Sequence, residues 1–376
     1  MTMMAFARTD QSVIGRWWWT VDRWLLALIT VIAAIGVVLI VAASPPVAVR
    51  IGLSNYDFVY KHLTMLAPAL AIMVGVSLLS PRDVRRLGVV MFVGSMVLLA
   101  ATLVIGVEIK GARRWIHVPG LSLQPSEFVK PSFAIVAAWL FARAKSVPGF
   151  PGSLICIALY LCVAALLLMQ PDLGMAFVVS SVWFSQFFLA GLPILLVGVL
   201  AILGMGGLVG AYFLLPHVAS RINRFLDPAS GDTYQVDRSL EAFLNGGLFG
   251  TGPGQGTVKF QLPDAHADFI FAVAGEELGL IACIVIVLLF AVVVLRGFQR
   301  AFGSGNLFIL LAVSGICVQF GLQTLVNMGS SLHLIPTKGM TLPLISYGGS
   351  SLLAVGFGLG ALLALTRVRH GTEAGA

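Results

Sequence analysis

Charge is scarce in this sequence. Of its 376 residues only 10% are Asp, Glu, Lys or Arg, whereas 59% are hydrophobic and the mean hydropathy is +0.98. Soluble domains carry about 25% charged and about 45–50% apolar residues, so a water-soluble globule of this size is excluded. Intrinsic disorder is excluded as well, because the chain is rich in Leu, Val, Ile and Phe. A polytopic membrane protein remains.

Cysteine and nucleotide-binding signals are scarce too. The four cysteines all lie in apolar runs, at Cys156, Cys162, Cys283 and Cys317. Their spacing matches no zinc ligand set, so we expect small core residues. The glycine-rich run 250–256 lacks a preceding strand and a Lys-Ser/Thr pair, which favours a flexible turn over a nucleotide-binding loop. The net charge of +7 indicates basic cytoplasmic loops and not nucleic acid as a partner.

Long apolar runs are what the sequence does contain, and a helix needs about 20 apolar residues to cross a bilayer. Such runs predict ten transmembrane helices, over residues 25–43, 63–79, 87–107, 127–142, 153–170, two within 173–220, 269–295, 306–328 and 350–366. The run 173–220 is too long for one helix, and Gly191-Leu192-Pro193 divides it. We therefore expect an all-α integral membrane protein of about ten transmembrane helices.

The predicted organisation is one membrane domain, 25–366, between a cytoplasmic N-terminal segment, 1–24, and a cytoplasmic tail, 367–376. The short loops 80–88 and 296–305 are basic and nearly free of acids, which places both termini in the cytoplasm. A long external loop, 216–268, joins the seventh and eighth spans. Basic residues also gather in external loops, where topology does not require them, and this suggests an anionic ligand such as a lipid phosphate.

Two motifs bring charge to the external edge of the membrane. In the first, Arg113-Arg114 precede Glu127 and Lys130, which lie three apart on one helix face. Charges inside a span are functional candidates, although this pair can also serve only to neutralise itself and anchor the helix. In the second, Asp172 occupies a tight Gln-Pro-Asp-Leu-Gly turn, where it either belongs to a site or caps the sixth helix.

Two further motifs lie where the chain re-enters the membrane. Asp268 ends the long loop, and a carboxylate there can be partly desolvated yet meet a polar substrate. That suits a general base, the alternative being an N-cap of the eighth helix. Two or more turns deeper, Glu276 and Glu277 need partners within the bundle. The run 336–351, whose only charge is Lys338, interrupts apolar sequence with prolines and glycines. Its backbone must therefore line a cavity or be buried in the protein. A turn of this kind at a helix start is a plausible binding site for an anion.

Taken in order, these motifs resemble one family, the SEDS proteins (shape, elongation, division and sporulation), which are integral membrane glycosyltransferases of peptidoglycan synthesis. The resemblance runs from about Phe58 to Ser351. It is carried by Arg113-Arg114-Trp115-Ile116, Gln124-Pro125-Ser126-Glu127, Gln170-Pro171-Asp172-Leu173-Gly174, His266-x-Asp268-Phe269-Ile270-Phe271-Ala272 and Ile345-Ser346-Tyr347-Gly348-Gly349-Ser350-Ser351. The stretch around Lys338 is similar to that of the division branch, and the run Leu262-Pro263-Asp264-Ala265-His266 to that of its alphaproteobacterial members.

The resemblance implies an enzyme that polymerises lipid II into glycan strands on the external face of the bacterial inner membrane, at the division septum. It implies Asp268 as the general base, with Glu127 and Lys130 also catalytic. The substrate-binding residues implied are Lys61, Arg113, Arg114, Asp172, Arg221, Arg224, His266, Lys338, Ser346 and Ser350. Two positions depart from the family. Lys61 stands where Arg is common and can bind phosphate only as a point charge, and Ala267 stands where Thr is frequent and offers no hydroxyl.

The partners implied are lipid II, the nascent glycan strand, a class B penicillin-binding protein (a transpeptidase) and other membrane proteins of the divisome. No dedicated metal cage is visible, which leaves Mg²⁺ or Mn²⁺ as an optional companion of the substrate diphosphate. Two rival functions stay open, a transporter that moves lipid II across the membrane and a scaffold that only recruits a transpeptidase. The candidate residues gather on one side of the membrane and not at its midplane, which favours the enzyme.

Overall fold

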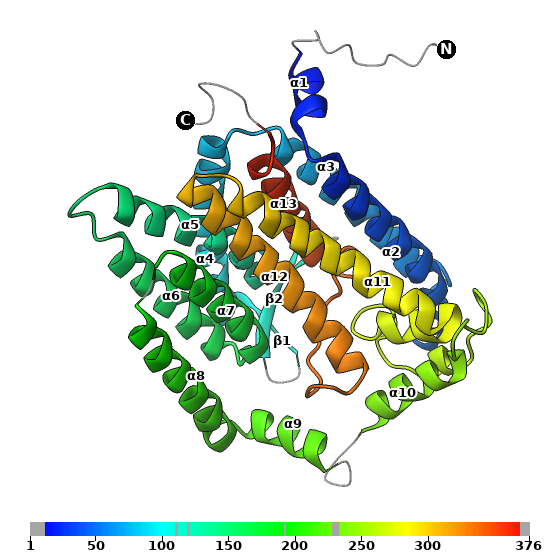
Figure 1. Ribbon diagram of the computed structural model, residues 1–376. Helices are drawn as coiled ribbons and strands as arrows, with labels where there is room; N and C mark the ends of the chain where they lie inside the picture. The colour runs from blue at the N-terminus through cyan, green and yellow to red at the C-terminus, as the bar shows by residue number, and fades with distance from the viewer. Residues whose placement is uncertain (1–11, 110–111, 119–120, 192, 228–232, 369–376) are drawn as a thin grey trace.

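A computed structural model of the chain shows a helical bundle with one small sheet (Figure 1). It describes residues 12–109, 112–118, 121–191, 193–227 and 233–368. The predicted terminal segments therefore lie partly outside the described residues, at 1–11 and 369–376. The short helix α1 (Val13–Thr20) and the C-terminal end of α13 (Gly349–Leu365) lie at one end of the bundle, as an even number of spans requires. The backbone N–H of Val368 donates to Thr20 O at 2.9 Å.

Each predicted span corresponds to a helix in the described part of the chain. They are α2 (Arg23–Arg50), α3 (Asp57–Ser77), α4 (Pro81–Ile105), α5 (Pro125–Ser146), α6 (Gly152–Met169), α7 (Leu173–Leu189), α8 (Ile194–Leu214), α11 (Ile270–Phe302), α12 (Leu307–Ser331) and α13. Seven of these helices are long and apolar enough to cross a membrane; α7 and α13 are apolar but shorter, and α5 carries charges. The predicted class, a multi-span helical membrane protein, is confirmed.

Two helices, α5 and α13, form the centre of the bundle. Helix α5 contacts α4, α6, α7, α12 and α13, whereas α13 packs mainly on α3. The close approach of α13 to α3 depends on two glycines one turn apart. A side chain on Gly356 would collide with the backbone of Ala69, and the Cβ of a side chain at Gly360 would lie 2.7 Å from Met73 O. Small residues at this spacing let the two helices pack backbone against backbone.

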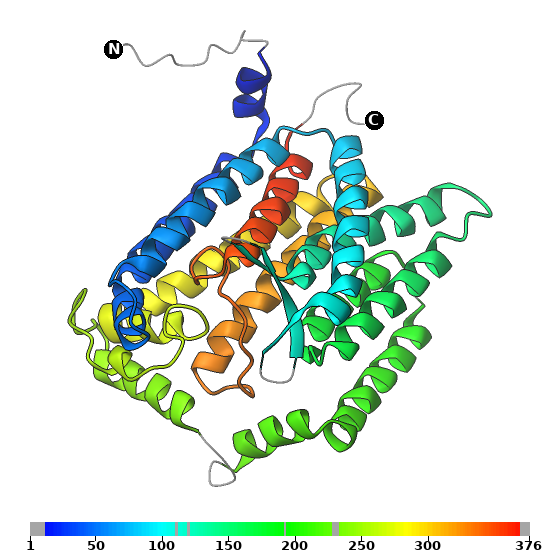
Figure 2. The same ribbon diagram turned by 180° about the vertical axis from the view of Figure 1, so that it is seen from behind.

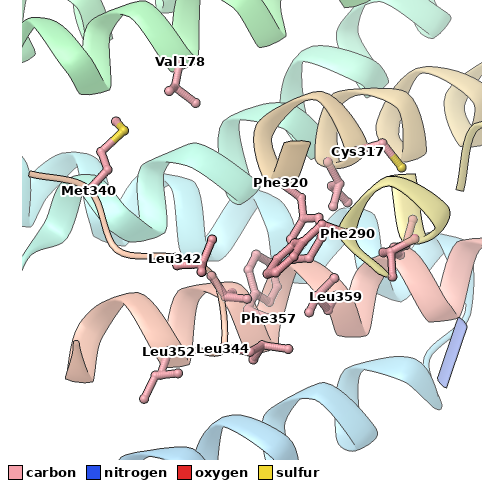
Figure 3. Close-up of a cluster of buried hydrophobic side chains, with 14 of the residues drawn as sticks. Val178, Phe290, Cys317, Phe320, Met340, Leu342, Leu344, Leu352, Phe357 and Leu359 are labelled. Atoms are coloured by element: carbon pink, nitrogen blue, oxygen red, sulfur yellow. The ribbon is translucent and has the colours of Figure 1, made fainter. Parts of the chain in front are cut away.

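The hydrophobic core continues under the segment that joins α12 to α13. Leu342 and Leu344 of that segment point into the bundle near Phe357, and Met340 lies on the side of Val178 (Figure 3). Burial of these side chains sets the position of the segment along the bundle axis, so its polar residues face the end of the bundle opposite α1. Three of the cysteines are buried, as predicted, with Cys317 among the core side chains in Figure 3.

The core assignment is wrong for Cys162, which is exposed on α6. Cys162 lies in an apolar run of the sequence because its side chain faces the lipid around the bundle and not the protein interior.

A three-stranded antiparallel sheet, absent from the predicted all-α architecture, lies between α4 and α5 (Figure 2). Its strands are β1 (Val107–Ile109), β2 (Ala112–Val118) and β3 (Leu121–Leu123), in the order β1-β2-β3. Strand β2 packs against α4 and α5. Because successive side chains of a strand point to opposite faces, the adjacent arginines of β2 are directed to different surroundings.

The long loop between α8 and α11 contains helix α9 (Pro216–Leu226), helix α10 (Tyr234–Gly246) and a 3₁₀ turn (Val258–Phe260). It meets α11 at Gly279, whose left-handed backbone (φ 80°) breaks the helix. The two N–H groups after the break donate to the carbonyls of Gly247 and Leu248. The N–H groups of Thr251 and Gly252 donate to the carbonyls of residues 276 and 277, with all four distances between 2.9 and 3.2 Å. The backbone groups that the break frees are thus paired inside the protein, as a membrane requires.

Glu276 and Glu277, which precede the break, find their partners in the long loop and its helix α10. The sequence predicts instead that they pair within the bundle of membrane spans. Glu276 accepts hydrogen bonds from the N–H groups of residues 257–259, at 2.6–2.9 Å, and from the side chain of Asn245 at 2.9 Å. Glu277 pairs with Lys259 and accepts from a backbone N–H of the glycine-rich run. The turn expected over residues 250–256 is present, and hydrogen bonds anchor it to residues 276 and 277.

Candidate active site

A cavity of about 930 Å³ opens at the end of the bundle opposite α1. Its walls come from α3, the sheet, the first turns of α5, α7 and α13, helix α9 and the segments 264–268 and 338–348. Nine of the predicted site residues line it: Lys61, Arg114, Glu127, Asp172, Arg221, His266, Asp268, Lys338 and Ser350. Residues spread over almost 300 positions of the sequence therefore meet in one place.

Asp172 is the centre of a cation cluster. Its carboxylate is 2% exposed and lies 2.7 Å from Lys338 Nζ and 3.7 Å from Arg114 Nη1. Arg114 is held in turn by the carbonyls of Gln170 and Pro171. Asp172 also accepts the backbone N–H of Met175 at 3.3 Å. The capping alternative is confirmed by this hydrogen bond, and the same carboxylate also contacts two cations that line the cavity.

Lys338 reaches Asp172 across Gly174. A side chain at position 174 would occupy the place of the Lys338 methylenes, which explains the glycine that ends the turn. Burial alone raises the pKa of Asp172, but Lys338 and Arg114 outweigh it and lower the pKa below its ordinary value. Burial, with the neighbouring cations Arg114 and Arg221, lowers the pKa of Lys338, and Asp172 only partly offsets this. The ammonium group is therefore poorly hydrated and faces other cations, a setting that favours an anionic ligand.

Asp268 lines the same cavity, half-buried at the end of the long loop. The residue at the N-cap position of α11 is Phe269, so the structure does not support the alternative in which Asp268 caps that helix. Gly339 packs directly on the Asp268 carboxylate, and a Cβ at this glycine would lie 2.6 Å from Oδ2. Residues 338 and 339 thus present a cation to one aspartate and bare backbone to the other.

Glu127 and Lys130 pair at 2.9 Å, but only Glu127 lines the cavity. Lys130 lies behind it, 2% exposed, and donates a hydrogen bond to Gln323 Oε1 at 2.8 Å. In this position the ammonium group supports the cavity wall through its two partners.

His266 belongs to an aromatic group at one wall of the cavity. Its ring lies 4.2 Å from that of Phe58 and 5.2 Å from that of Tyr347, centroid to centroid. The backbone N–H of Tyr347 donates to His266 O at 2.9 Å. Burial, helped by Arg50, lowers the pKa of His266 to about 4, although Asp264 opposes the shift. The imidazole is therefore neutral at physiological pH.

Besides Lys130, three predicted site residues do not line the cavity, and Lys61 lies at its edge. Arg113 points away from the cavity and pairs with Glu108 at 3.4 Å, because it alternates with Arg114 along β2. The guanidinium of Arg224 donates to the backbone of its own helix, α9. The hydroxyl of Ser346 donates to a backbone carbonyl at 2.6 Å and is 1% exposed. Lys61, half-exposed at the rim, pairs with an acidic residue one turn away at 2.7 Å.

Sequence reasoning missed two buried carboxamides behind the cavity, Gln323 and Asn327. Both lie on α12 and are nearly inaccessible to solvent. A signal was present, because Gln319, Gln323 and Asn327 recur every four residues in an otherwise apolar helix and so share one face. Polar side chains on one face of a span mark a functional face by the same argument that marked Glu127.

Metal binding has no preformed site among residues 12–109, 112–118, 121–191, 193–227 and 233–368. No group of three His, Cys, Asp or Glu side chains there is placed to hold a metal ion.

Comparisons with known proteins agree with this geometry. Residues 22–371 match the family model described as "Cell cycle protein", which covers FtsW, RodA and SpoVE. The chain is 44% identical over 368 residues to the "Probable peptidoglycan glycosyltransferase FtsW" of Caulobacter vibrioides, an alphaproteobacterium, covering 98% of this chain and 94% of that one. It is 37% identical over 333 residues to the protein of the same name from Escherichia coli O157:H7, covering 85% and 79%.

Two solved structures share the fold. The rod shape determining protein RodA of Thermus thermophilus aligns with a TM-score of 0.68 and 30% identity, over 93% of this chain and 97% of that one. A chain from "Structural coordination of polymerization and crosslinking by a peptidoglycan synthase complex" aligns with a TM-score of 0.73 and 30% identity, over 92% and 97%. With its order of motifs and these relatives, the chain belongs to the FtsW/RodA/SpoVE family of cell cycle proteins, the SEDS family.

Proposed function

We propose that this protein is a peptidoglycan glycosyltransferase that polymerises lipid II into glycan strands. The observation that carries the proposal is the cavity that places Asp268 beside three cations, Lys338, Arg114 and Arg221. A transfer from a diphosphate-linked sugar needs both features, a base for the attacking hydroxyl and cations for the departing diphosphate. The relatives named peptidoglycan glycosyltransferase support the same reaction.

In the proposed reaction the growing strand is the donor, and the 4-hydroxyl of the next lipid II is the acceptor. The hydroxyl oxygen forms a bond to the anomeric carbon of the donor while the bond from that carbon to the diphosphate oxygen breaks. Asp268 accepts the hydroxyl proton as the new bond forms, and the configuration at the carbon inverts. The cations stabilise the negative charge that develops on the diphosphate.

The ion pairs of the cavity support this division of roles. Asp172 holds Lys338 and Arg114 together, although both cations lie near Arg221 and repel it. An incoming diphosphate would share these cations with Asp172. Glu127 would shape the wall beside the sugar, backed by its pair with Lys130.

The volume of the cavity suits a sugar-diphosphate head and not the whole substrate. About 930 Å³ is near the upper end of the roughly 300–1,000 Å³ found for ligand sites. The polyprenyl chain would therefore lie against the lipid-facing sides of the helices, where its apolar surface needs no protein cavity. This explains why such an enzyme is built almost wholly in the membrane.

The proposed surroundings follow from the family. The site would face the outside of the bacterial cytoplasmic membrane at the division septum, with both termini in the cytoplasm. A class B penicillin-binding protein would be the partner, because a solved relative belongs to a synthase that coordinates polymerisation and crosslinking. Other divisome membrane proteins would assemble around this pair.

A decisive experiment is lipid II polymerisation by the purified complex with the Asp268→Ala variant. We expect folding and partner binding to persist and glycan synthesis to stop. Asp237→Asn is the control, because that carboxylate lies on α10 and bonds Thr233 away from the cavity. Full synthesis by Asp268→Ala would eliminate the base assignment. If the protein moves lipid II across the bilayer of liposomes, and the movement depends on Asp268, the transporter is favoured. If the variant without glycan synthesis still supports every function that needs the complex, the scaffold is favoured.

A further inference from the structure

Asn327 connects the two segments that carry the opposing charges of the site. It is 0% exposed in α12, and its side-chain Nδ2 donates to Asp268 O at 3.0 Å and to Met340 O at 2.6 Å. Both acceptors lie outside regular helices, where carbonyls depend on such side chains for partners. A carboxamide offers two N–H donors, so one side chain can hold both carbonyls at once.

Gln323 makes a matching connection one turn earlier on the same face of α12. Its Nε2 donates to Thr341 O at 3.0 Å and to Thr341 Oγ1 at 3.2 Å, while its Oε1 accepts from Lys130. The turn that follows Lys338 is therefore fastened to α12 at two consecutive residues, Met340 and Thr341. Such a doubly held turn cannot move along the helix without breaking buried hydrogen bonds.

These hydrogen bonds determine the distance between Asp268 and the turn that contains Lys338 and Gly339. Gly339 lies next to the Met340 anchor and packs against the Asp268 carboxylate. The backbone of Asp268 is tied to the same Asn327 amide that ties Met340. One amide thus sets where the carboxylate stands relative to the residue that follows Lys338. Reacting groups held within a few tenths of an ångström depend on supports of this kind.

We propose that Asn327 is a positioning residue, which fixes Asp268 against the Lys338–Gly339 turn and thereby sets the rate of glycosyl transfer. This inference rests on the proposed function, because it gives Asp268 the role of general base. Asn327 itself touches no substrate in this scheme. Without it, Lys338 would still be held by its ion pair with Asp172 and by the hydrogen bond from its backbone N–H to Ser330 Oγ at 3.3 Å. Loss of Asn327 should therefore lower kcat and leave KM nearly unchanged.

The chain offers a matched control for the loss of a buried amide. Gln186 on α7 is also 0% exposed, and its Nε2 donates to the carbonyls of Ala134 and Leu311 at 2.7 and 3.0 Å. It joins α7 to α5 and α12 through the same number of hydrogen bonds, but away from the cavity. Gln186→Leu and Asn327→Leu therefore remove equivalent interactions and differ in what those interactions hold.

The experiment measures steady-state lipid II polymerisation and thermal unfolding for the purified complex with each variant. We expect Asn327→Leu to lower kcat by about 10- to 100-fold with KM within about 3-fold, whereas Gln186→Leu keeps kcat within about 2-fold. Asn327→Asp keeps the shape but loses the donors, so it should lower kcat in the same way and provides a second variant if Asn327→Leu does not fold.

Two results would overturn the inference. One is wild-type kcat in both Asn327 variants while Asp268→Asn is inactive, which leaves the proposed function intact and removes only the role of Asn327. The other is an equal loss of kcat in Asn327→Leu and Gln186→Leu at equal loss of thermal stability, which would make Asn327 a structural residue only. Activity in Asp268→Asn would overturn both the proposed function of Asp268 and this inference.

Discussion

Lys338→Met tests whether Lys338 serves the substrate or only neutralises Asp172. Methionine keeps the length of the side chain over Gly174 but removes the ammonium group 2.7 Å from a carboxylate that is 2% exposed. Removing one partner of a buried ion pair costs about 3–5 kcal/mol, because the other charge is left without compensation. Arg114 stays 3.7 Å away and keeps part of the compensation, so we expect a loss of about 2–4 kcal/mol.

The double variant Lys338→Met/Asp172→Asn separates stability from activity. It removes both charges of the pair, and the asparagine can still accept the hydrogen bond that caps α7. Replacing both members of a buried ion pair often leaves stability unchanged. The free energy of unfolding of the double variant should therefore lie within about 1 kcal/mol of the wild-type value. Its polymerisation rate should nevertheless stay at least about 100-fold below wild type, because the diphosphate has lost a cation.

The measurements are thermal unfolding of the detergent-solubilised protein and the rate of glycan synthesis from lipid II. The stability of the single variant should fall and that of the double variant should recover, while the activity of both stays low. Recovery of activity together with stability in the double variant would refute the reasoning. Lys338 would then be a counter-ion of Asp172 and nothing more.

Three other changes have defined expected outcomes. Glu276→Gln places an amide N–H₂ against the backbone N–H of Lys259 and removes a charge from the remaining bonds, so it should lower the free energy of unfolding by about 3 kcal/mol. The pKa of His266 is about 4 in the folded state and about 6.5 when unfolded, so the unfolded state binds more protons between these values and stability falls as the pH is lowered. The contribution of His266 to this loss at pH 5 is about 2 kcal/mol, so the difference in stability between pH 7 and pH 5, measured by thermal unfolding, should be smaller by that amount in His266→Gln. Gly339→Ala should push the Asp268 carboxylate aside and lower kcat by about 10-fold or more, with little change in thermal stability.

Matched variants keep these predictions sharp. Glu241→Gln affects a half-exposed pair with Arg238 and should change stability by less than about 1 kcal/mol; an equal effect of Glu276→Gln would contradict the anchoring role. Gly94→Ala adds a methyl group where nothing lies within 4 Å and should leave kcat unchanged. A parallel pH dependence in wild type and His266→Gln would show that other groups cause the acid sensitivity.

Hydropathy predicted the helices because the membrane imposes one rule on every span. Even α5, which carries Glu127 and Lys130, stood out as a short apolar run, and its two charges indicated that it faces polar surroundings. The helices are longer than the predicted runs at several ends. Helix α3 begins at Asp57 and not near residue 63, because backbone hydrogen bonding continues past charged residues that a hydropathy window excludes.

The sheet and the details of the site could not be read in the same way. Strands of three to seven residues give little periodic signal, so Arg113 and Arg114 appeared equivalent although β2 points them apart. The charged candidates mostly reached the cavity because charge is expensive in lipid and collects where water or ligand can enter. The neutral supports, such as Asn327, are recognised only by the carbonyls they bind, and those lie far away in the sequence.

The pairing of Glu276 and Glu277 with the long loop also dictates an order of biosynthesis. Carboxylates oppose the insertion of a nascent helix into lipid, by up to about 2.5–3.5 kcal/mol each at mid-membrane. The residues that pair with them, from Asn245 to Lys259, precede α11 in the chain and are translated first. When α11 leaves the ribosome, its acidic end is therefore delivered to a waiting protein surface and not to lipid. A deletion within this loop should be felt first in the yield of correctly inserted α11, before any substrate is met.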